Sequence, residues 1–174
     1  MKRSISTYIA IAVLAVFGLG GLVGGTVAIR MVDSNLKAQQ ITFEQTSPYP
    51  GQKVDNGLAA YRFQLQIDKH VKAALKPAGF STYEQVSAAA RATATAANPA
   101  GDPKLMGLRR TALDGQLLRG TLFSSFAWWM VGWVGIAAGA AFLLLAGLTF
   151  LLSGGKRETL FFPAPAKTPE TVSV

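Results

Sequence analysis

The sequence of 174 residues contains no cysteine and only one histidine, His70. Without cysteine the chain cannot form a disulfide framework, a zinc knuckle or a cysteine nucleophile. A single histidine is too few for the ligand set of a zinc site, and a non-haem iron site needs two histidines and a carboxylate. We therefore expect no metal and no other cofactor, and we interpret His70 as a partly exposed residue of a helix.

Charge is also scarce, because only 15% of the residues are charged whereas 50% are apolar. Typical soluble domains are about a quarter charged, so this composition favours a membrane protein. Residues 5–29 and residues 121–155 contain no charged side chain at all. About 20 apolar residues cross a bilayer, so each stretch is long enough for one transmembrane helix.

The first apolar stretch has two interpretations. Lys2 and Arg3 precede it, and the small residues at 26–28 resemble a cleavage site, so it could be a signal peptide. Its apolar core is far longer than is usual in signal sequences, which favours an uncleaved membrane anchor. Three tryptophans lie near the start of the second stretch: Trp128, Trp129 and Trp133. Aromatic side chains of this kind mark the headgroup level, so we expect them to anchor the helix at the interface.

The orientation follows from the flanks of the two stretches. Lys2 and Arg3 favour a cytoplasmic N-terminus, and the basic residues after position 155 favour a cytoplasmic C-terminus. Equally many basic residues flank the loop, but a loop of about 90 residues crosses the membrane largely regardless of its charge. We predict a two-span protein of the cell membrane with both termini in the cytoplasm and the loop outside.

The predicted fold is an all-α membrane protein, in which a helical extracytoplasmic module joins two antiparallel transmembrane helices. The chain divides into an N-terminal transmembrane helix (1–32), the module (33–120), a second transmembrane helix (121–154) and a proline-punctuated, disordered cytoplasmic tail (155–174). Asp33 or Ser34 is expected to cap a short helical extension after the first span.

Residues 58–76 form an amphipathic pattern that predicts a helix stopped by Pro77. A strand-like alternation covers only seven of these residues, which favours the helix. Basic side chains gather on one face: Arg62, Lys69, Lys72 and Lys76. This basic stripe either keeps the module soluble or contacts anionic headgroups or an acidic partner. Aromatic residues do not interleave with the basic residues, so we expect no binding of nucleic acid.

Two further helices are expected in the module. Ser81 and Glu84 match a capping box, which would open an alanine-rich helix that extends to about residue 97. Residues 104–119 lead as a helix into the second span, where Gly115 and Gly120 leave room for a kink.

The stretch GLGGLVGG places five glycines within positions 18–25. It is not a dinucleotide fingerprint, because Val23 stands where the third glycine is needed, and no P-loop lysine follows. In an apolar helix, glycines at i and i+4 let a second helix approach closely, which favours association in lipid. Helix packing is expected at Gly18, Gly20, Gly21, Gly24, Gly25, Gly132, Gly135 and Gly139. The two spans pack on each other, or the glycines face a helix of another chain, and the pattern fits both.

No Asp, Glu, Lys, Arg or His lies within either apolar stretch. Proton relays, ion pathways and transport sites normally need such residues, so a channel or transporter is disfavoured. No nucleophile motif such as G-x-S-x-G is present, and the spacing of the carboxylates indicates no acid–base pair. We therefore predict that the chain is not an enzyme.

Four segments carry a resemblance to a known family: STYIAIAVLAVFGL, AAYRFQLQIDKHVKAAL, STYEQV and LLRGTLFSS. They resemble small two-span membrane proteins of actinobacteria, a family of unknown function whose members are often labelled aromatic ring-opening dioxygenases. The label implies an iron-dependent enzyme, which a single histidine does not support. An acidic Asp-Pro-rich stretch follows the Tyr-Glu box in that family, whereas this chain has SAAARATATAANPAGDPK. The resemblance thus implies an envelope membrane protein.

The expected function is that of an accessory or scaffolding subunit that packs against a larger respiratory or cell-envelope complex. Its expected partners are membrane lipid and other membrane protein subunits. An alternative is an envelope sensor whose module binds a lipid or small ligand in a pocket lined by Phe63, Ile67, Phe80 and Tyr83. A membrane-bound hydrolase is a more remote alternative, because no motif supports it.

Overall fold

The computed structural model describes residues 5–154, and this part of the chain contains helices and loops but no strand. The elements in chain order are α1 (Ile5–Gln39), α2 (Gly57–Leu75), the 3₁₀ helix η1 (Lys76–Ala78), α3 (Tyr83–Ala92) and α4 (Pro103–Gly154). The predicted all-α class is confirmed for these residues. The predicted tail at 155–174 lies outside the described residues, as do Lys2 and Arg3, on which the predicted orientation depends.

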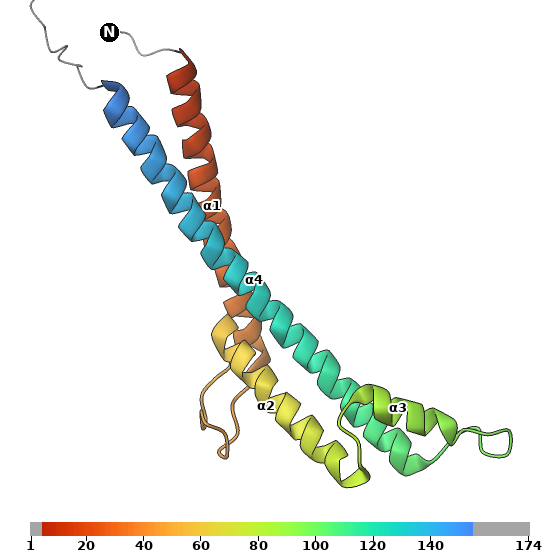
Figure 1. Ribbon diagram of the computed structural model, residues 1–174. Coiled ribbons are helices and arrows are strands. Elements are labelled where there is room, and N and C mark those ends of the chain that lie inside the picture. The colour runs from red at the N-terminus through yellow and green to blue at the C-terminus, as the bar shows by residue number, and fades with distance from the viewer. Residues whose placement is uncertain (1–4, 155–174) are drawn as a thin grey trace, which may run out of the picture.

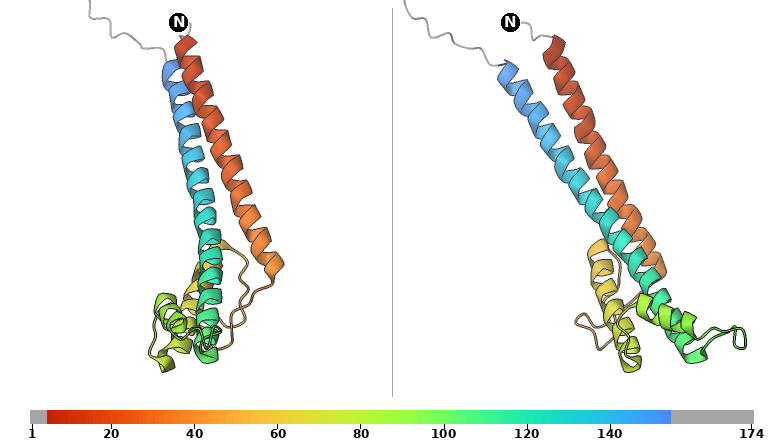
Figure 2. Two further views of the ribbon diagram at one scale, coloured as in Figure 1. Left: turned by 90° about the vertical axis from the view of Figure 1, so that its right-hand side faces the viewer. Right: turned by 45° about the vertical axis from the view of Figure 1, so that its right-hand side comes forward.

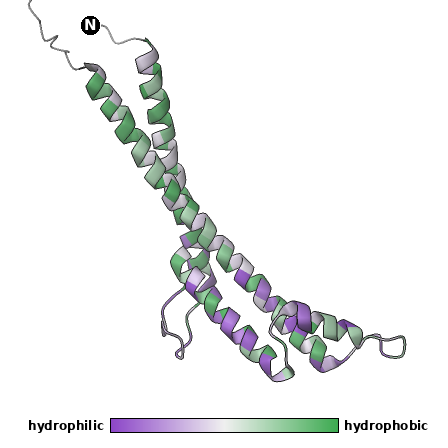
Figure 3. Ribbon diagram, in the orientation of Figure 1, coloured by the Kyte–Doolittle hydropathy of each residue, from purple (hydrophilic) through white to green (hydrophobic). Residues whose placement is uncertain are grey.

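The helix α1 and the C-terminal half of α4 form a long stalk, and α2 and α3 lie against the N-terminal half of α4 (Figures 1 and 2). We call this second part, from the end of α1 to the middle of α4, the module. The stalk is mainly apolar, whereas polar residues concentrate in the module (Figure 3). Both long helices are apolar and long enough to cross a membrane, and only 11% of the most apolar window of each is buried. The core helix of a soluble protein would be mostly buried.

Both long helices continue through the boundaries that the sequence indicates. α4 is a single helix of 52 residues that belongs to the stalk and to the module, and it is not interrupted at Gly115 or Gly120. A glycine inside a helix costs only about 1 kcal/mol relative to alanine, and the contacts of α2 along α4 offset this cost. α1 likewise continues past Asp33 and Ser34, so neither residue caps a separate extension.

The helix expected at 58–76 is confirmed as α2, and capping explains its limits. Asn56 Oδ1 accepts a hydrogen bond from Ala59 N at 2.9 Å, which satisfies one of the free N–H groups of the first turn. At Pro77 the chain tightens into η1, because proline has no N–H to continue the helix. Gly79 then ends η1 with a φ of 80°, a left-handed conformation that glycine adopts without strain.

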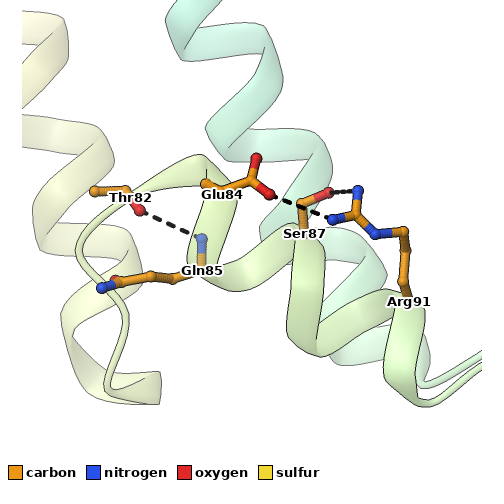
Figure 4. A network of polar contacts seen from close by, with 5 residues as sticks. All are labelled: Thr82, Glu84, Gln85, Ser87 and Arg91. Carbon is orange, nitrogen blue, oxygen red and sulfur yellow. Dashed lines mark hydrogen bonds and ion pairs between the residues drawn. The ribbon is translucent and has the colours of Figure 1, made fainter.

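The capping box before α3 is shifted by one residue from the predicted position (Figure 4). Thr82 is the N-cap in place of Ser81, and its Oγ1 accepts from Gln85 N at 3.3 Å. Gln85 Oε1 accepts in return from Ser81 N at 2.8 Å. Glu84 does not make this return bond and instead pairs with Arg91 at 3.4 Å. Ser81 to Glu84 and Thr82 to Gln85 are overlapping boxes of equal spacing, so spacing alone does not separate them.

α3 ends at Ala92, well before the predicted end near residue 97. Thr93 Oγ1 donates to Ala90 O at 2.7 Å and accepts from Asp102 N at 2.8 Å, so this hydroxyl joins the end of α3 to the start of α4. Asp102 in turn caps α4 by accepting from Lys104 N at 2.7 Å. Side chains that bond the backbone in this way compete with helix continuation despite a run of alanines.

Thr82→Ala is expected to lower the free energy of unfolding by about 1 kcal/mol, because it removes the N-cap acceptor of α3. Ser81→Ala is the matched control, since it removes only the exposed bond from Ser81 Oγ to Gln85 Oε1 and keeps both the Ser81 N–H bond to Gln85 and the Thr82 cap. Thermal unfolding of both variants, followed by circular dichroism, measures the difference. Equal losses in the two variants would contradict the assignment of the cap to Thr82.

Two small apolar cores hold the module together. The first joins α1, the loop after it, α2 and α4 through Leu36, Phe43, Val54, Ala59, Ala60 and Leu122. The second joins α2, α3 and α4 through Leu75, Val86 and Ala112. Both α2 and α4 contribute to both cores, so the contact between these two helices joins the two halves of the module.

Candidate functional site

Three glycines of α1 meet three glycines of α4 in reverse order along the stalk. Gly18 lies against Gly139, Gly21 against Gly135, and Gly25 against Gly132. A Cβ atom added to Gly21 would lie 2.7 Å from Gly135 O, closer than real Cβ atoms approach other atoms. One added to Gly139 would lie 2.6 Å from Gly18 O. The two backbones are therefore in direct contact, which is the packing that small residues allow in lipid.

The two remaining glycines of the stretch, Gly20 and Gly24, do not face α4. No atom lies within 4 Å of a Cβ added at either position, once the backbone of their own helix is set aside. The pair Gly21 and Gly25 is thus used inside the chain, whereas Gly20 and Gly24 form an uncovered strip, which we call the free glycine strip. Neighbouring residues of a helix point about 100° apart, which explains why two pairs offset by one residue have different surroundings.

The three tryptophans have different surroundings. Trp128 and Trp133 are 61% and 49% exposed, whereas the Trp129 ring lies over Gly57, the first residue of α2. Any side chain at position 57 would overlap that ring. Further along α2, the Tyr61 ring lies on the Phe126 ring with their centroids 4.8 Å apart. Trp129 therefore fastens the start of α2 to α4, a contact that the sequence did not indicate.

The basic stripe of α2 does not present four equivalent cations. The Arg62 guanidinium lies 4.7 Å from the centre of the Tyr49 ring, and Lys72 Nζ donates to Asp68 Oδ2 at 2.8 Å. Lys69 and Lys76 are exposed. Lys72 is exposed as well, but it is paired with Asp68, so the stripe combines two cations held by neighbouring side chains with the exposed Lys69 and Lys76.

His70 is exposed on α2, and its Nε2 lies 3.6 Å from Glu44 Oε2. Among residues 5–154 no three or more His, Cys, Asp or Glu side chains gather as a metal site would require. The described part of the chain thus offers no cluster that could hold a metal ion.

One carboxylate between α2 and α4 is shared by two cations. Asp68 Oδ1 lies 2.7 Å from Arg119 Nη1, and Asp68 Oδ2 lies 2.8 Å from Lys72 Nζ. The side chain of Asp68 is 20% exposed, whereas those of Arg119 and Lys72 are 37% and 61% exposed. The group therefore presents its cations at the surface, carries one positive charge in excess and holds its carboxylate deeper.

Two hollows adjoin this charged group. The first has a volume of about 250 Å³, and its polar lining comes from Asp68, Lys72, Ser81, Thr82, Gln116 and Arg119. The second is more open, has a volume of about 490 Å³, and is lined by Tyr61, Gln64, Gln116, Arg119, Gly120 and Phe123. Because they share Gln116 and Arg119, the hollows lie next to each other along α4. We call them the polar hollow and the aromatic hollow.

The pocket expected from four apolar residues of the module is not formed. Phe63 and Ile67 pack on the first apolar core, whereas Phe80 and Tyr83 pack on the second. Tyr83 also borders the polar hollow. The pKa of its phenol is lowered, mainly by a hydrogen bond with Ser87 and to a smaller extent by one with Arg109. Both hollows are built from residues of α2 and α4, and the start of α3 and the loop before it add to the polar hollow. These residues lie far apart in the sequence, so no local spacing could have indicated the hollows.

Comparison with known proteins adds no relative. No protein-family model, no curated protein and no solved structure matches this chain. The resemblance to the actinobacterial two-span proteins therefore stays a prediction, and the function has to be inferred from the geometry.

Proposed function

We propose that the chain is a non-enzymatic integral membrane protein that serves as an accessory or scaffolding subunit of a larger respiratory or cell-envelope complex. In this proposal α1 and α4 cross the cell membrane in opposite directions, both termini are cytoplasmic, and the module stands outside. The observation that carries the proposal is the free glycine strip at Gly20 and Gly24. A transmembrane helix of the partner subunit would pack on this strip as α4 packs on Gly21 and Gly25.

The connection between stalk and module supports a scaffolding role. Because α4 continues without interruption from one into the other, a subunit bound at the stalk has a defined position relative to the module. The contact of Trp129 with Gly57 and the apolar core around Leu36 join the two parts at further points. Membrane lipid would cover the rest of the stalk, where large apolar side chains such as Val16 and Leu144 are 68% and 69% exposed.

Purification in a mild detergent followed by native mass spectrometry tests the proposal. The wild-type chain is expected to co-purify with a larger membrane protein. The double variant Gly20→Leu, Gly24→Leu is expected to be recovered alone with a melting temperature no lower than that of the wild type, because both positions have open space in the folded chain and leucine favours a helix more than glycine does. Ala12→Leu adds the same kind of bulk at another exposed position of α1 and is expected to keep the partner.

Two results would contradict this proposal. The first is recovery of the wild-type chain only as a monomer in several mild detergents. The second is retention of the partner by the Gly20→Leu, Gly24→Leu variant, because a helix packed on the strip has no room for two leucine side chains.

A further inference from the structure

We infer that the polar hollow between α2, α3 and α4 binds a phosphodiester group. The inference does not depend on the proposed function, because it concerns the module and not the glycine strip of the stalk. The hollow joins a charged group, hydroxyl side chains and an amide from three separate parts of the chain: α2, the loop before α3, and α4. Such convergence of a few polar groups in a concave site is typical of ligand recognition.

The charge of the hollow selects for a singly charged anion. Asp68 neutralises one of the two cations that it contacts, so Lys72 and Arg119 together leave one positive charge. A phosphodiester carries one negative charge, whereas a phosphomonoester carries about 1.5 to 2 at neutral pH. The side chains of Lys72 and Arg119 are more exposed than the Asp68 carboxylate. An anion that enters the hollow is therefore attracted by the two cations more strongly than it is repelled by Asp68.

The placement of the donors favours phosphate over a carboxylate of the same charge. Lys72 approaches from α2, Arg119 and Gln116 from α4, and the Thr82 hydroxyl from the loop before α3. The neighbouring Ser81 hydroxyl donates to Gln85 Oε1 at 3.0 Å, so it lines the hollow without serving as a free donor. A carboxylate offers two oxygens in one plane, whereas a phosphate group offers oxygens in several directions. Arginine and lysine are both common phosphate ligands, arginine by paired hydrogen bonds and lysine as a point charge.

The aromatic hollow would hold the rest of the ester. It continues from Arg119 along α4 toward the stalk, and its walls include Tyr61 and Phe123, of which Phe123 is 53% exposed. Gly120 leaves this hollow open, because no atom lies within 4 Å of a Cβ added there. The phosphodiester could belong to a phospholipid or to a soluble molecule, and the two sources differ in whether acyl chains add to the affinity.

Calorimetric titration of the full chain in an uncharged detergent distinguishes these sources. The probes are dihexanoyl phosphatidylglycerol and its deacylated counterpart, glycerophosphoglycerol. Stronger binding of the acylated probe identifies a phospholipid, whereas equal binding identifies a soluble phosphodiester, and both results support the inference. Failure of both probes to bind the wild-type chain would overturn it.

Matched variants test the residues of the two hollows. Lys72→Gln and Arg119→Gln are each expected to weaken binding about tenfold, because each removes a charge-assisted hydrogen bond. Lys69→Gln makes the same change about one helical turn before Lys72, at an exposed position that does not line the hollow. This variant is expected to bind as the wild type does. The Lys72 variant keeps the ion pair of Asp68 with Arg119, so it tests the site even if the Arg119 variant unfolds. Unchanged binding by Lys72→Gln would overturn the inference.

Gly120→Leu separates binding from folding. It is expected to fill the aromatic hollow and weaken the acylated probe, while raising the melting temperature because leucine favours a helix more than glycine does. Gly107→Leu is the control, since Gly107 lies in the same helix with open space and outside both hollows. It is expected to raise the melting temperature without changing the binding. Equal binding of the acylated probe by both leucine variants would contradict the assignment of the ester to the aromatic hollow.

Discussion

Gly25→Leu is expected to separate α1 from α4, whereas Gly24→Leu is expected to leave the two helices in contact. A Cβ at position 25 would collide with Gly132 O and would lie 2.9 Å from Ile136 N. These are backbone atoms of α4, which cannot rotate away as a side chain can. Overpacking of a buried site typically costs about 1–3 kcal/mol, and a whole leucine side chain against backbone is expected to reach or exceed the upper end. Position 24 has open space, so its substitution costs little.

Spin labels measure this difference directly, because the chain has no cysteine of its own. Ile9→Cys and Leu148→Cys place one label on each helix of the stalk, at side chains that are 58% and 54% exposed. Pulsed electron paramagnetic resonance measures the distance between the two labels. The distribution of this distance is expected to be short and narrow in the labelled parent and in Gly24→Leu. Gly25→Leu is expected to give a longer and broader one. An unchanged distribution in Gly25→Leu would show that α1 and α4 do not depend on glycine for their contact.

Leu36→Ala is expected to lower the free energy of unfolding by about 2–5 kcal/mol, the range found for large-to-small changes in a packed core. Leu36 is 1% exposed and lies in the first apolar core with Phe43, Val54 and Leu122. These residues come from three parts of the chain, so the loss should loosen the loop between α1 and α2 in particular. Leu117→Ala is the control, because Leu117 is 60% exposed on α4 and is expected to cost less than about 0.5 kcal/mol.

Hydrogen exchange of the loop reports this loosening. Phe43 N donates to Gln52 O, and Val54 N donates to Ile41 O, each at 2.9 Å. Both bonds cross the loop next to Leu36, so their amides are expected to exchange faster in Leu36→Ala and at the parent rate in Leu117→Ala. Slow exchange at both amides in Leu36→Ala would mean that the first apolar core does not hold this loop.

The helical class and the long apolar helices follow from local properties of the sequence. Composition and the spacing of apolar residues are visible in any window of the chain, so α2 and the two apolar stretches could be predicted without a structure. The first residue of α3 could not be predicted in the same way. Ser81 and Thr82 begin capping boxes of equal spacing, and only the fold shows that Thr82 is the N-cap. The continuity of α4 through Gly115 was also not visible, since α2 contacts stabilise a helix that glycine alone would weaken.

Composition and residue spacing are enough to predict that the chain is helical, that two of its helices are apolar enough to cross a membrane, and that both of these helices carry glycines. The packing of α1 on α4 is needed to show that Gly21 and Gly25 contact α4 while Gly20 and Gly24 stay uncovered. The tertiary structure alone brought Asp68 to Arg119 and split the expected apolar pocket into two cores. The reason is physical: the rotation of one helix against another and the meeting of distant residues depend on packing between elements, which no local pattern encodes.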